Sequence, residues 1–473
     1  MRNGVGVDVA VIGAGTAGLA AYRAARAAGA SALIVEAGPY GTTCARVGCM
    51  PSKLLIAAAE AAHAIARAPG FGVHVDAPVG VDGREVMARV RRERDRFVGF
   101  VLDGVEKIPA ADRITGHARF VDPNTLEVEG GPRIAARSIV IATGSRPSVP
   151  PMLQGLGDRL VVNDDVFSWD DLPKSVAVFG PGVIGLELGQ ALARLGVRVV
   201  VLGRGGRLGP ITDPVVQQAA RKAFCAEFLL DPDAHVSRVQ RDGDQVVVDY
   251  VGPAGEPRSE RFDFVLAATG RLPNVDRLGL EMAGVQRDAR GVPLFDPSTL
   301  QAGESSIFIA GDAANDVPLL HEAADEGRIA GENAARFPQV KPALRRARLG
   351  VVFTDPQIAI VGRGFASLPP HALAGEVSFE DQGRARVMLR NRGHLRVYAS
   401  ADTGRFLGAE MVGPDAEHIG HLLAWALQAN MTAAQMLDMP FYHPVVQEGL
   451  RTALRDLDAR IREAQPPRIA AVA

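Results

Sequence analysis

The segment Val7-Asp8-Val9-Ala10-Val11-Ile12-Gly13-Ala14-Gly15-Thr16-Ala17-Gly18 decides the fold of this chain. Its apolar half predicts a buried β-strand, and its glycine-rich half predicts a tight turn that opens a helix. In such a turn Gly13 and Gly15 let the backbone bend and approach a pyrophosphate, while Gly18 lets the helix pack closely on the strand. The free amides at the start of the helix also favour a bound phosphate. The segment therefore predicts a dinucleotide-binding turn.

The residues that follow complete a Rossmann-like unit. An alanine-rich stretch runs to Ala28, and Gly29 then leads into the apolar residues 31–35, which end at Glu36. The order of strand, turn, helix, strand and acid predicts a parallel α/β arrangement in which Glu36 binds a ribose diol. We therefore expect an α/β fold whose first unit holds a dinucleotide.

A second copy of this pattern lies further along the chain. The apolar residues 176–179 lead into a turn with the glycines Gly180, Gly182 and Gly185. Gly13 and Gly18 map onto Gly180 and Gly185 with the same offset of 167 residues. One such fingerprint can be a glycine turn without any ligand, but two copies in the same context favour two nucleotide sites. The sequence therefore predicts a pair of dinucleotides such as FAD with NAD or NADP.

The two copies differ at the position of the acid. The residue that lies 167 positions after Glu36 is Gly203, and Arg204 and Arg207 follow it. An acid at this position favours the free 2′-hydroxyl of NAD, whereas its absence beside arginines admits the 2′-phosphate of NADP. Arg204 and Arg207 can equally form a solvated charged loop, so the sequence leaves the choice of nucleotide open.

The composition predicts a globular protein without a large charged surface. The chain has 473 residues, 47% of them hydrophobic, and a formal net charge of −2. These values predict about three domains, each with its own core, and no nucleic-acid or membrane partner. Residues 1–7 lack the features of a secretory signal, and no apolar run reaches the ~20 residues of a membrane span. We therefore expect a soluble, cytoplasmic protein.

Two of the three cysteines lie close together in sequence. Four residues separate Cys44 from Cys49, so a turn or a helix start can bring their sulfurs into bonding distance. In a reducing cytosol such a pair is more often catalytic or metal-binding than structural. No other Cys or His lies nearby to complete a metal site, so we expect no metal; two unrelated buried thiols are the alternative. Cys225 is expected to be an inert thiol in the core.

Seven segments make the chain resemble a known family, the pyridine nucleotide–disulfide oxidoreductases of the glutathione reductase and dihydrolipoamide dehydrogenase type. They occur in that family's order over nearly the whole chain. The segments are residues 44–53, 142–147, 268–274, 310–313 and 443–448 and the two glycine turns, the second of which is followed by Glu187.

The resemblance implies two Rossmann-like FAD/NAD(P)-binding domains and a C-terminal α+β dimerisation domain. A homodimer is therefore expected. On this plan the FAD domain comprises residues 1–150 and 273–342, the inserted NAD(P) domain residues 151–272 and the dimerisation domain residues 343–473. The tail from Gln465 to Ala473 is expected to be frayed.

The resemblance also implies roles for the cysteines and for one histidine. Cys49 lies against the flavin and Cys44 faces the substrate, because one sulfur cannot serve both. His443 is the base that removes a proton from a substrate thiol, and Glu448 orients its ring. In the family this pair reaches the cysteines from the other subunit. From sequence alone, His443 can instead cap a helix, with Glu448 exposed to solvent.

Further residues are expected to surround the cofactors. The resemblance pairs Lys53 with Glu187 near the reactive flavin nitrogen, where a buried cation stabilises reduced flavin and needs a partner acid. It places Asp312 on the ribityl chain and His321 in a helix start that faces the ring. Lys53 and Asp312 can otherwise be ordinary surface charges. The other expected cofactor contacts are Thr143, Gly144 and Gly270.

The substrate is expected to be a dihydrolipoyl group. All three cysteines precede residue 226, whereas mercuric reductases and large thioredoxin reductases usually add a C-terminal pair. Ala24 follows Arg23 where glutathione reductases carry a second arginine. Dihydrolipoamide dehydrogenase is the best remaining match, helped by residues 320–322, 383–387 and 441–444. Two residues depart from the expected pattern: Gly203 replaces the acid of NAD-specific members, and Thr42 replaces a usual glycine. An NADPH-dependent disulfide reductase of the glutathione reductase type is therefore an alternative function. A non-catalytic flavoprotein is an alternative of another class.

Overall fold

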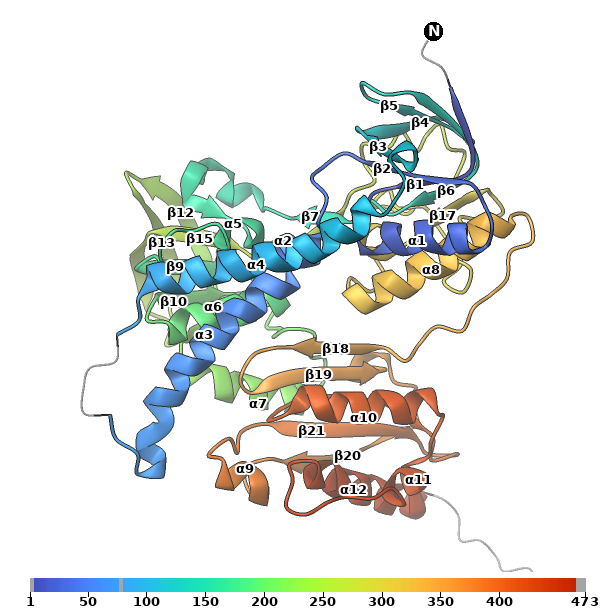
Figure 1. The fold of residues 1–473 in the computed structure, drawn as a ribbon. Helices are drawn as coiled ribbons and strands as arrows, with labels where there is room; N and C mark the ends of the chain where they lie inside the picture. Colours follow the sequence, from blue (N-terminus) through green and yellow to red (C-terminus); the bar gives the residue numbers. More distant parts are fainter. Residues whose placement is uncertain (1–3, 76–79, 465–473) are drawn as a thin grey trace, which may run out of the picture.

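The computed structural model describes residues 4–75 and 80–464, so the expected fraying of Gln465–Ala473 concerns residues outside these ranges. Figure 1 shows three bodies, each built around its own β-sheet. The chain enters the first body, crosses to the second, returns to the first and ends in the third.

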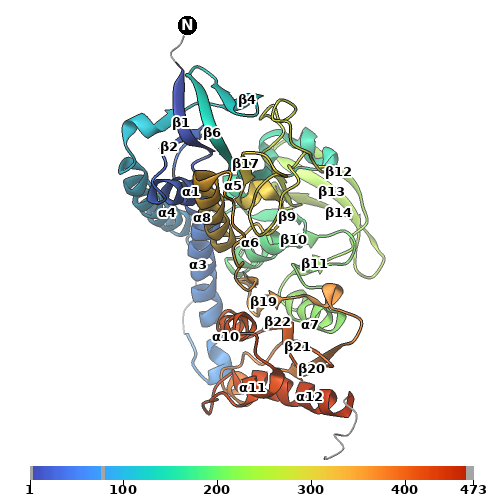
Figure 2. The ribbon, with the colours of Figure 1, turned by 90° about the vertical axis from the view of Figure 1, so that its right-hand side faces the viewer.

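The first body is a seven-stranded sheet with the segment that decides the fold near its centre. Its strands are β1 (Val5–Ile12), β2 (Ala32–Glu36), β3 (Arg113–Thr115), β4 (Ala118–Asp122), β5 (Thr125–Val128), β6 (Arg133–Ile141) and β17 (Ile307–Ile309). Helices α1 (Thr16–Ala27) and α8 (Leu320–Arg336) lie side by side against it (Figures 1 and 2). They can approach closely because Gly327 has no side chain. A Cβ added at this position would lie 2.1 Å from the carbonyl oxygen of Ala17.

The second body repeats this plan with a five-stranded parallel sheet. In spatial order its strands are β11 (Leu229–Asp231), β10 (Arg198–Leu202), β9 (Ser175–Phe179), β15 (Phe264–Ala267) and β8 (Leu160–Val161). Its other elements are α5 (Asn163–Val166), α6 (Val183–Arg194), α7 (Pro214–Cys225) and an antiparallel sheet of β12 (Val236–Asp242), β13 (Gln245–Val251) and β14 (Pro257–Phe262). The predicted pair of Rossmann-like units is confirmed.

Two short strands mark where the chain crosses between these bodies. β7 (Ser145–Pro147) leaves the first sheet, and β16 (Arg271–Pro273) brings the chain back and pairs antiparallel with β7. The outward and returning crossings therefore lie side by side, as an inserted domain requires. The domain boundaries at residues 150, 272 and 342 stay a prediction.

The third body is an antiparallel sheet with helices, which confirms the α+β expectation for the C-terminal region. Its strands run in the order β18 (Leu349–Val352), β19 (Gln357–Gly362), β22 (Phe406–Gly413), β21 (His394–Ser400) and β20 (Ala372–Ser378). Its helices are α9 (Gly383–Val387), α10 (Ala416–Gln428), α11 (Ala433–Leu437) and α12 (Glu448–Ala464). Buried Leu450, Leu454 and Leu457 lie on one face of α12 and join the core of this body.

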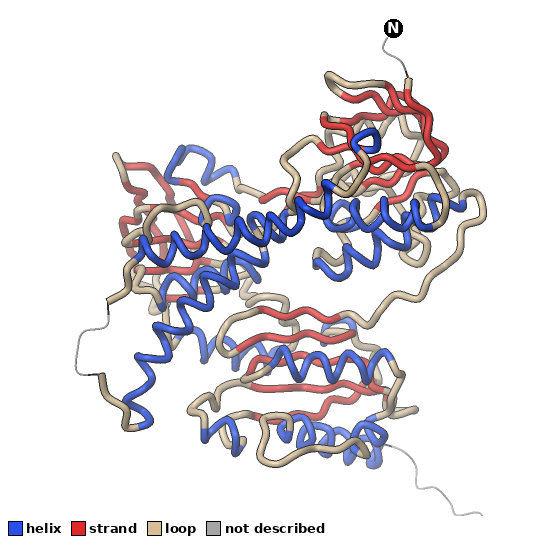
Figure 3. The backbone as a smooth tube through the Cα atoms, viewed as in Figure 1, coloured by secondary structure: helices blue, strands red, loops and turns tan. Residues whose placement is uncertain are grey.

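Long helices link the first two bodies (Figure 3). The short helix α2 (Thr43–Val47) is followed at once by α3 (Cys49–Arg67), which packs against α4 (Gly83–Glu106) and against α6 of the second body. Leu55, Ile56 and Ala59 of α3 are buried in the same core cluster as the second sheet. The cysteine segment is therefore anchored on the second body.

Within residues 4–75 and 80–464, none of the helices combines the length and the apolar character that crossing a membrane requires.

Candidate active site

The two cysteines meet at the junction between α2 and α3. Gly48 alone separates these helices, and a Cβ added to it would lie 3.2 Å from the Cα of Cys44. The tight junction brings Cys44 next to Cys49, whose sulfur accepts a hydrogen bond from the Cys44 thiol. Both are free thiols, Cys44 half-buried and Cys49 exposed. In the described part of the chain, no group of three or more His, Cys, Asp or Glu residues is placed to hold a metal ion.

Thr42 fills the position where the family usually has glycine. Its φ of 57° lies in the region that favours glycine. Its Oγ1 accepts a hydrogen bond from the backbone N–H of Ala45 at 3.3 Å and so caps α2. The cap offsets the backbone strain that the side chain brings.

The hydrogen bond between the thiols makes them electrostatically unequal. Together with the Lys53 ammonium, it lowers the pKa of Cys49 to about 7. The same bond, in which Cys44 is the donor, raises the pKa of Cys44, and burial acts in the same direction. Near neutral pH, Cys49 is therefore the thiol that ionises more readily, and its place against the flavin stays a prediction.

Lys53 and Glu187 form an ion pair that joins α3 to α6. Lys53 Nζ lies 2.7 Å from Glu187 Oε2 and 3.0 Å from Oε1, and the Glu187 side chain is 5% exposed. The backbone N–H of Phe353 donates to Glu187 Oε1 at 2.9 Å, and Lys53 Nζ lies 4.5 Å from the centre of the Phe353 ring. The expected pair is thus present. Phe353 went unpredicted because it lies 166 residues beyond Glu187 and no local pattern marks it.

The first glycine turn has the shape of a phosphate cradle. A Cβ on Gly13 would lie 2.3 Å from the carbonyl oxygen of Ala142, and one on Gly18 would lie 1.8 Å from that of Gly13. By contrast, a Cβ on Gly15 would meet nothing within 4 Å, so no protein neighbour requires this glycine. Gly15 caps the N-terminus of α1, where free amides face the open space. The turn therefore fits the pyrophosphate of FAD.

Two carboxylates at the carboxyl ends of strands in the first sheet have fixed orientations. Glu36 accepts hydrogen bonds from the backbone N–H groups of Ala14 at 2.6 Å and Gly38 at 2.7 Å. Asp312, just after β17, accepts one from the Ser145 hydroxyl at 2.6 Å. Ligands of open α/β sheets bind at this edge, and the contacts of Glu36 and Asp312 with FAD stay a prediction.

The other residues expected around the flavin lie on neighbouring segments. Thr143 Oγ1 donates to the carbonyl oxygen of Asn274 at 2.7 Å, and Gly144 has a φ of 67°. His321 is exposed in the first turn of α8. Glu326, which sequence reasoning missed, is buried on α8 and accepts a hydrogen bond from the N–H of Gly311 at 2.7 Å. An acid on the apolar face of a predicted helix was the available signal.

The second glycine turn repeats the geometry of the first. A Cβ on Gly180 would lie 2.4 Å from the carbonyl oxygen of Ala268, and one on Gly185 would lie 1.9 Å from that of Gly180. A Cβ on Gly182 would again meet nothing within 4 Å, and Gly270 opposite has a φ of 105°. The turn fits the pyrophosphate of a nicotinamide nucleotide.

The position that corresponds to Glu36 in the second unit is Gly203, directly after β10, and it has no room for an acidic side chain. A Cβ on Gly203 would lie 2.5 Å from the carbonyl oxygen of Pro232 and 2.7 Å from Pro181 Cγ. Arg204 and Arg207 are both exposed in the loop that follows.

His443 and Glu448 contact each other as expected, but this chain does not bring them to Cys44. His443 Nδ1 lies 3.0 Å from both carboxylate oxygens of Glu448, and this contact lowers the pKa of Glu448. The His443 side chain is 79% exposed. Glu448 begins α12 in the third body, whereas α2 lies between the first two bodies (Figure 1).

The prediction that Cys225 lies in the core is wrong. Cys225 is exposed at the last position of α7, where its thiol donates to the carbonyl oxygen of Leu230 at 3.5 Å. The amphipathic helix turns this position outward, and the pKa of Cys225 is nevertheless raised by desolvation. The thiol therefore keeps its proton near neutral pH.

Comparison with known proteins agrees with this geometry. The model of the family described as pyridine nucleotide-disulphide oxidoreductase matches residues 7–327, and that of the family's dimerisation domain matches residues 349–454. The dihydrolipoyl dehydrogenase of Haloferax volcanii is 34% identical over 467 residues, which are 95% of this chain and 95% of that protein. The mercuric reductase of Shigella flexneri is 31% identical over 478 residues, 97% of this chain and 82% of that protein.

A solved structure shows the same fold over the same extent. The crystal structure of LpdA from Mycobacterium tuberculosis superimposes with a TM-score of 0.80 at 25% identity and covers 95% of this chain and 99% of its own. The chain therefore belongs to the pyridine nucleotide-disulphide oxidoreductase family and is a flavin-dependent disulfide oxidoreductase that uses FAD and NAD(P).

Proposed function

We propose that this enzyme oxidises dihydrolipoyl groups, on a small dithiol or on a lipoyl-carrying protein, with a nicotinamide nucleotide as the final acceptor. The observation that carries the proposal is the contact of Cys44 with Cys49 beside the Lys53–Glu187 pair. The likeness to dihydrolipoyl dehydrogenases over almost the whole chain supports this substrate. Bound FAD would supply the two-electron relay between the cysteines and the nicotinamide.

The two sulfurs divide the dithiol chemistry between them. In the oxidised enzyme they form a disulfide, and a substrate thiolate attacks the sulfur of Cys44, so that the bond to Cys49 breaks. The second substrate thiolate then displaces Cys44, which takes up a proton, and the substrate leaves as a disulfide. Cys49 is a good leaving group because the Lys53 ammonium lowers the pKa of its thiol.

His443 and Glu448 would complete the site from a second chain. A dithiol with an ordinary pKa of ~8.5 is mostly protonated at neutral pH, so its attack needs a base. The exposed His443, oriented by Glu448, has the required chemistry, but it directly precedes α12 of the third body, whereas the cysteines lie on α2 and α3 between the first two bodies. We therefore propose a homodimer in which the partner subunit's His443 serves Cys44.

An NADPH-dependent disulfide reductase of the glutathione reductase type is the second candidate. The observation in its favour is the filled space at Gly203, which leaves no room for an acid that binds the 2′-hydroxyl of NAD. The exposed Arg204 and Arg207 offer charges for a 2′-phosphate instead. In this case the same two cysteines would work in the opposite direction and reduce a disulfide.

One set of anaerobic measurements tests the proposal and separates the two candidates. NADH, NADPH or dihydrolipoamide is added to the purified enzyme, and we expect a long-wavelength absorption band from the Cys49 thiolate beside the flavin. Initial rates with lipoamide and with oxidised glutathione, each with both nucleotides, then identify the substrate. A protein that shows no band with any of the three reductants would contradict the proposal.

A further inference from the structure

A loop of the third body holds both members of the Lys53–Glu187 pair. Phe353 directly follows β18, and its backbone N–H donates to Glu187 at 2.9 Å. Its ring lies 4.5 Å from the ammonium of Lys53, a distance at which the ring face attracts a cation. One residue therefore restrains the acid through its main chain and the cation through its side chain.

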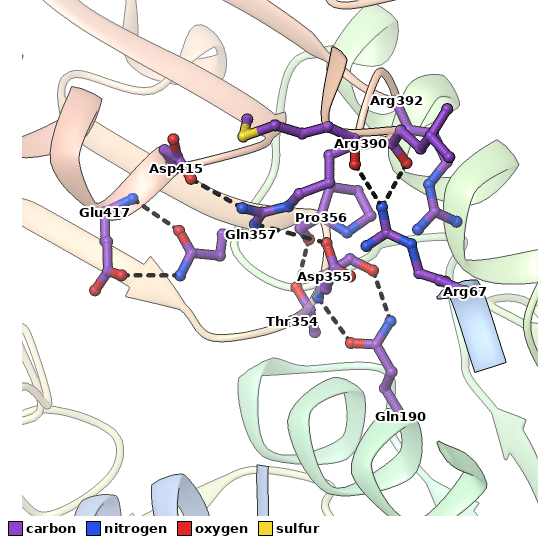
Figure 4. Close-up of polar contacts among 12 residues, drawn as sticks. Arg67, Gln190, Thr354, Asp355, Pro356, Gln357, Arg390, Arg392, Asp415 and Glu417 are labelled. Atoms are coloured by element: carbon purple, nitrogen blue, oxygen red, sulfur yellow. Dashed lines mark hydrogen bonds and ion pairs between the residues drawn. The ribbon is translucent and has the colours of Figure 1, made fainter. Parts of the chain in front are cut away.

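The same face of α6 that carries Glu187 also fixes this loop. Gln190 lies one turn further along α6 and is 4% exposed. Its Nε2 donates to the carbonyl oxygen of Asp355 at 2.7 Å, and its Oε1 accepts from the backbone N–H of Asp355 at 2.8 Å. Figure 4 shows the Gln190 amide facing residues 354 and 355. Two hydrogen bonds from one amide side chain hold the loop in register with Glu187.

Arg194, a further turn along α6, anchors the other side of the same loop. Its side chain is 6% exposed and donates to Asp355 Oδ2 at 3.0 Å and to Glu227 at 2.9 Å. Thr354, which is buried, donates its hydroxyl to the carbonyl oxygen of Pro356 at 2.8 Å. Residues 353–356 thus have few alternative positions, since moving them would leave buried polar groups unpaired.

We propose that Phe353 and Gln190 are positioning residues for the redox site: Gln190 fixes the loop, and Phe353 fixes the Lys53–Glu187 pair beside Cys49. The inference rests on the proposed function in one respect, namely that Cys49 acts as a thiolate. It gives the third body a role inside the redox site of its own chain, in addition to any role in joining two chains.

The consequence for Cys49 follows from the freedom of Lys53. Lys53 has a long flexible stem, so without the ring its ammonium is held less firmly beside Cys49. The Glu187 carboxylate stays in place, because the backbone N–H of residue 353 still donates to it. Cys49 then loses part of a favourable interaction and keeps an unfavourable one, and its ionisation shifts to higher pH.

The test measures the pH at which the thiolate band of the reduced holoenzyme is half developed. We expect Phe353→Leu to raise this midpoint by about half a pH unit, the size that loss of one cation–π contact implies. Phe353→Tyr keeps the ring and should keep the midpoint. Gln190→Met keeps the volume but loses both hydrogen bonds to Asp355, and it should raise the midpoint like Phe353→Leu.

Matched controls separate this role from general damage. Phe365 has a ring 5.8 Å from the guanidinium of Arg396, also in the third body, and Gln301 donates to the carbonyl oxygen of Ser305 at 2.8 Å. Phe365→Leu and Gln301→Met remove similar contacts elsewhere and should leave the midpoint unchanged. Unfolding temperatures are measured for all variants.

Each outcome bears on the inference. A band with an unshifted midpoint in both Phe353→Leu and Gln190→Met overturns the positioning role but leaves the proposed function intact. A wild-type enzyme that has no band overturns the proposed function instead. If Gln190→Met does not fold, the comparison of Phe353→Leu with Phe353→Tyr decides alone.

Discussion

Pro181 occupies the space into which a side chain at Gly203 would point, with Pro181 Cγ only 2.7 Å from the Cβ that such a side chain would need. The equivalent position in the first turn is Glu36, whose carboxylate binds two backbone N–H groups. The two copies of the turn agree in their glycines and differ at this point. The second turn therefore lacks both the acid and the room for one.

The first prediction concerns nucleotide choice. If Arg204 and Arg207 bind a 2′-phosphate, replacing both by glutamine should raise the KM for NADPH by about tenfold or more, the value of one charge-assisted contact. The KM for NADH should change little. Gly203→Glu should not create a preference for NADH, because the side chain meets Pro181 and Pro232, and it should lower the unfolding temperature. An unchanged KM for both nucleotides would assign the arginines to a solvated loop.

A second prediction concerns Gly15 and Gly182, at which an added Cβ would meet no protein atom within 4 Å. Gly15→Ala should fold but release FAD, whereas Gly182→Ala should keep FAD and bind the nicotinamide nucleotide more weakly, because each methyl group enters a different cradle. Gly18→Ala is the control, since its Cβ would lie 1.8 Å from a carbonyl oxygen and the fold itself should be disrupted. Flavin absorbance, nucleotide titration and circular dichroism measure the three results. If Gly15→Ala keeps its flavin, the first turn is not the cradle.

The third prediction concerns the pH dependence of Cys49. Its pKa is lowered to about 7, so the thiolate should be the major form above this pH and should be lost as the pH falls through it. The thiolate band of the reduced enzyme should follow the same curve. Cys49→Ser should keep FAD and lose both the band and dithiol turnover. Persistence of the band in Cys49→Ser would contradict the assignment of this sulfur.

The features that the sequence predicted correctly are those that local chemistry decides. Both glycine turns are constrained by close backbone contacts, within the turn itself and with the end of a neighbouring strand, that only glycine permits, so the pattern of glycines reveals them. The cysteine pair is likewise local, since one glycine sets the junction of two helices. The resemblance to a family then supplied Lys53 with Glu187 and His443 with Glu448, which are pairs that the structure shows in contact.

The features that the sequence did not predict depend on distant segments. The backbone N–H of Phe353 binds Glu187, and the Gln190 amide binds main-chain groups of Asp355; hydrogen bonds to or from the main chain leave no trace in residue type. The prediction that Cys225 is buried was wrong because Cys225 is the last residue of an amphipathic helix. Sequence patterns locate the end of a helix only to within a few residues, so they do not fix whether a terminal side chain faces the core or the solvent. The steric conflict at Gly203 needs Pro181 and Pro232, which meet only in the folded chain.

The last prediction tests whether His443 serves the cysteines of another chain. His443→Ala should slow reaction with the dithiol by roughly a hundredfold or more, the usual value of a general base, while reduction by the nucleotide changes much less. Rapid-mixing measurements of the two half-reactions distinguish these effects, and equal slowing of both would argue against the assigned role.

Mixed dimers then reveal which chain supplies the base. Cys49→Ser alone is expected to be inactive, and His443→Ala alone to keep about a hundredth of the wild-type activity or less. A dimer with one chain of each kind has one site in which an intact cysteine pair faces an intact histidine, provided that the histidine acts across the interface. Unfolding and refolding the two variants together should therefore restore about a quarter of the wild-type activity, because half of the dimers are mixed and each has one working site. A histidine that acts within its own chain restores nothing, since no chain in the mixture carries both intact groups.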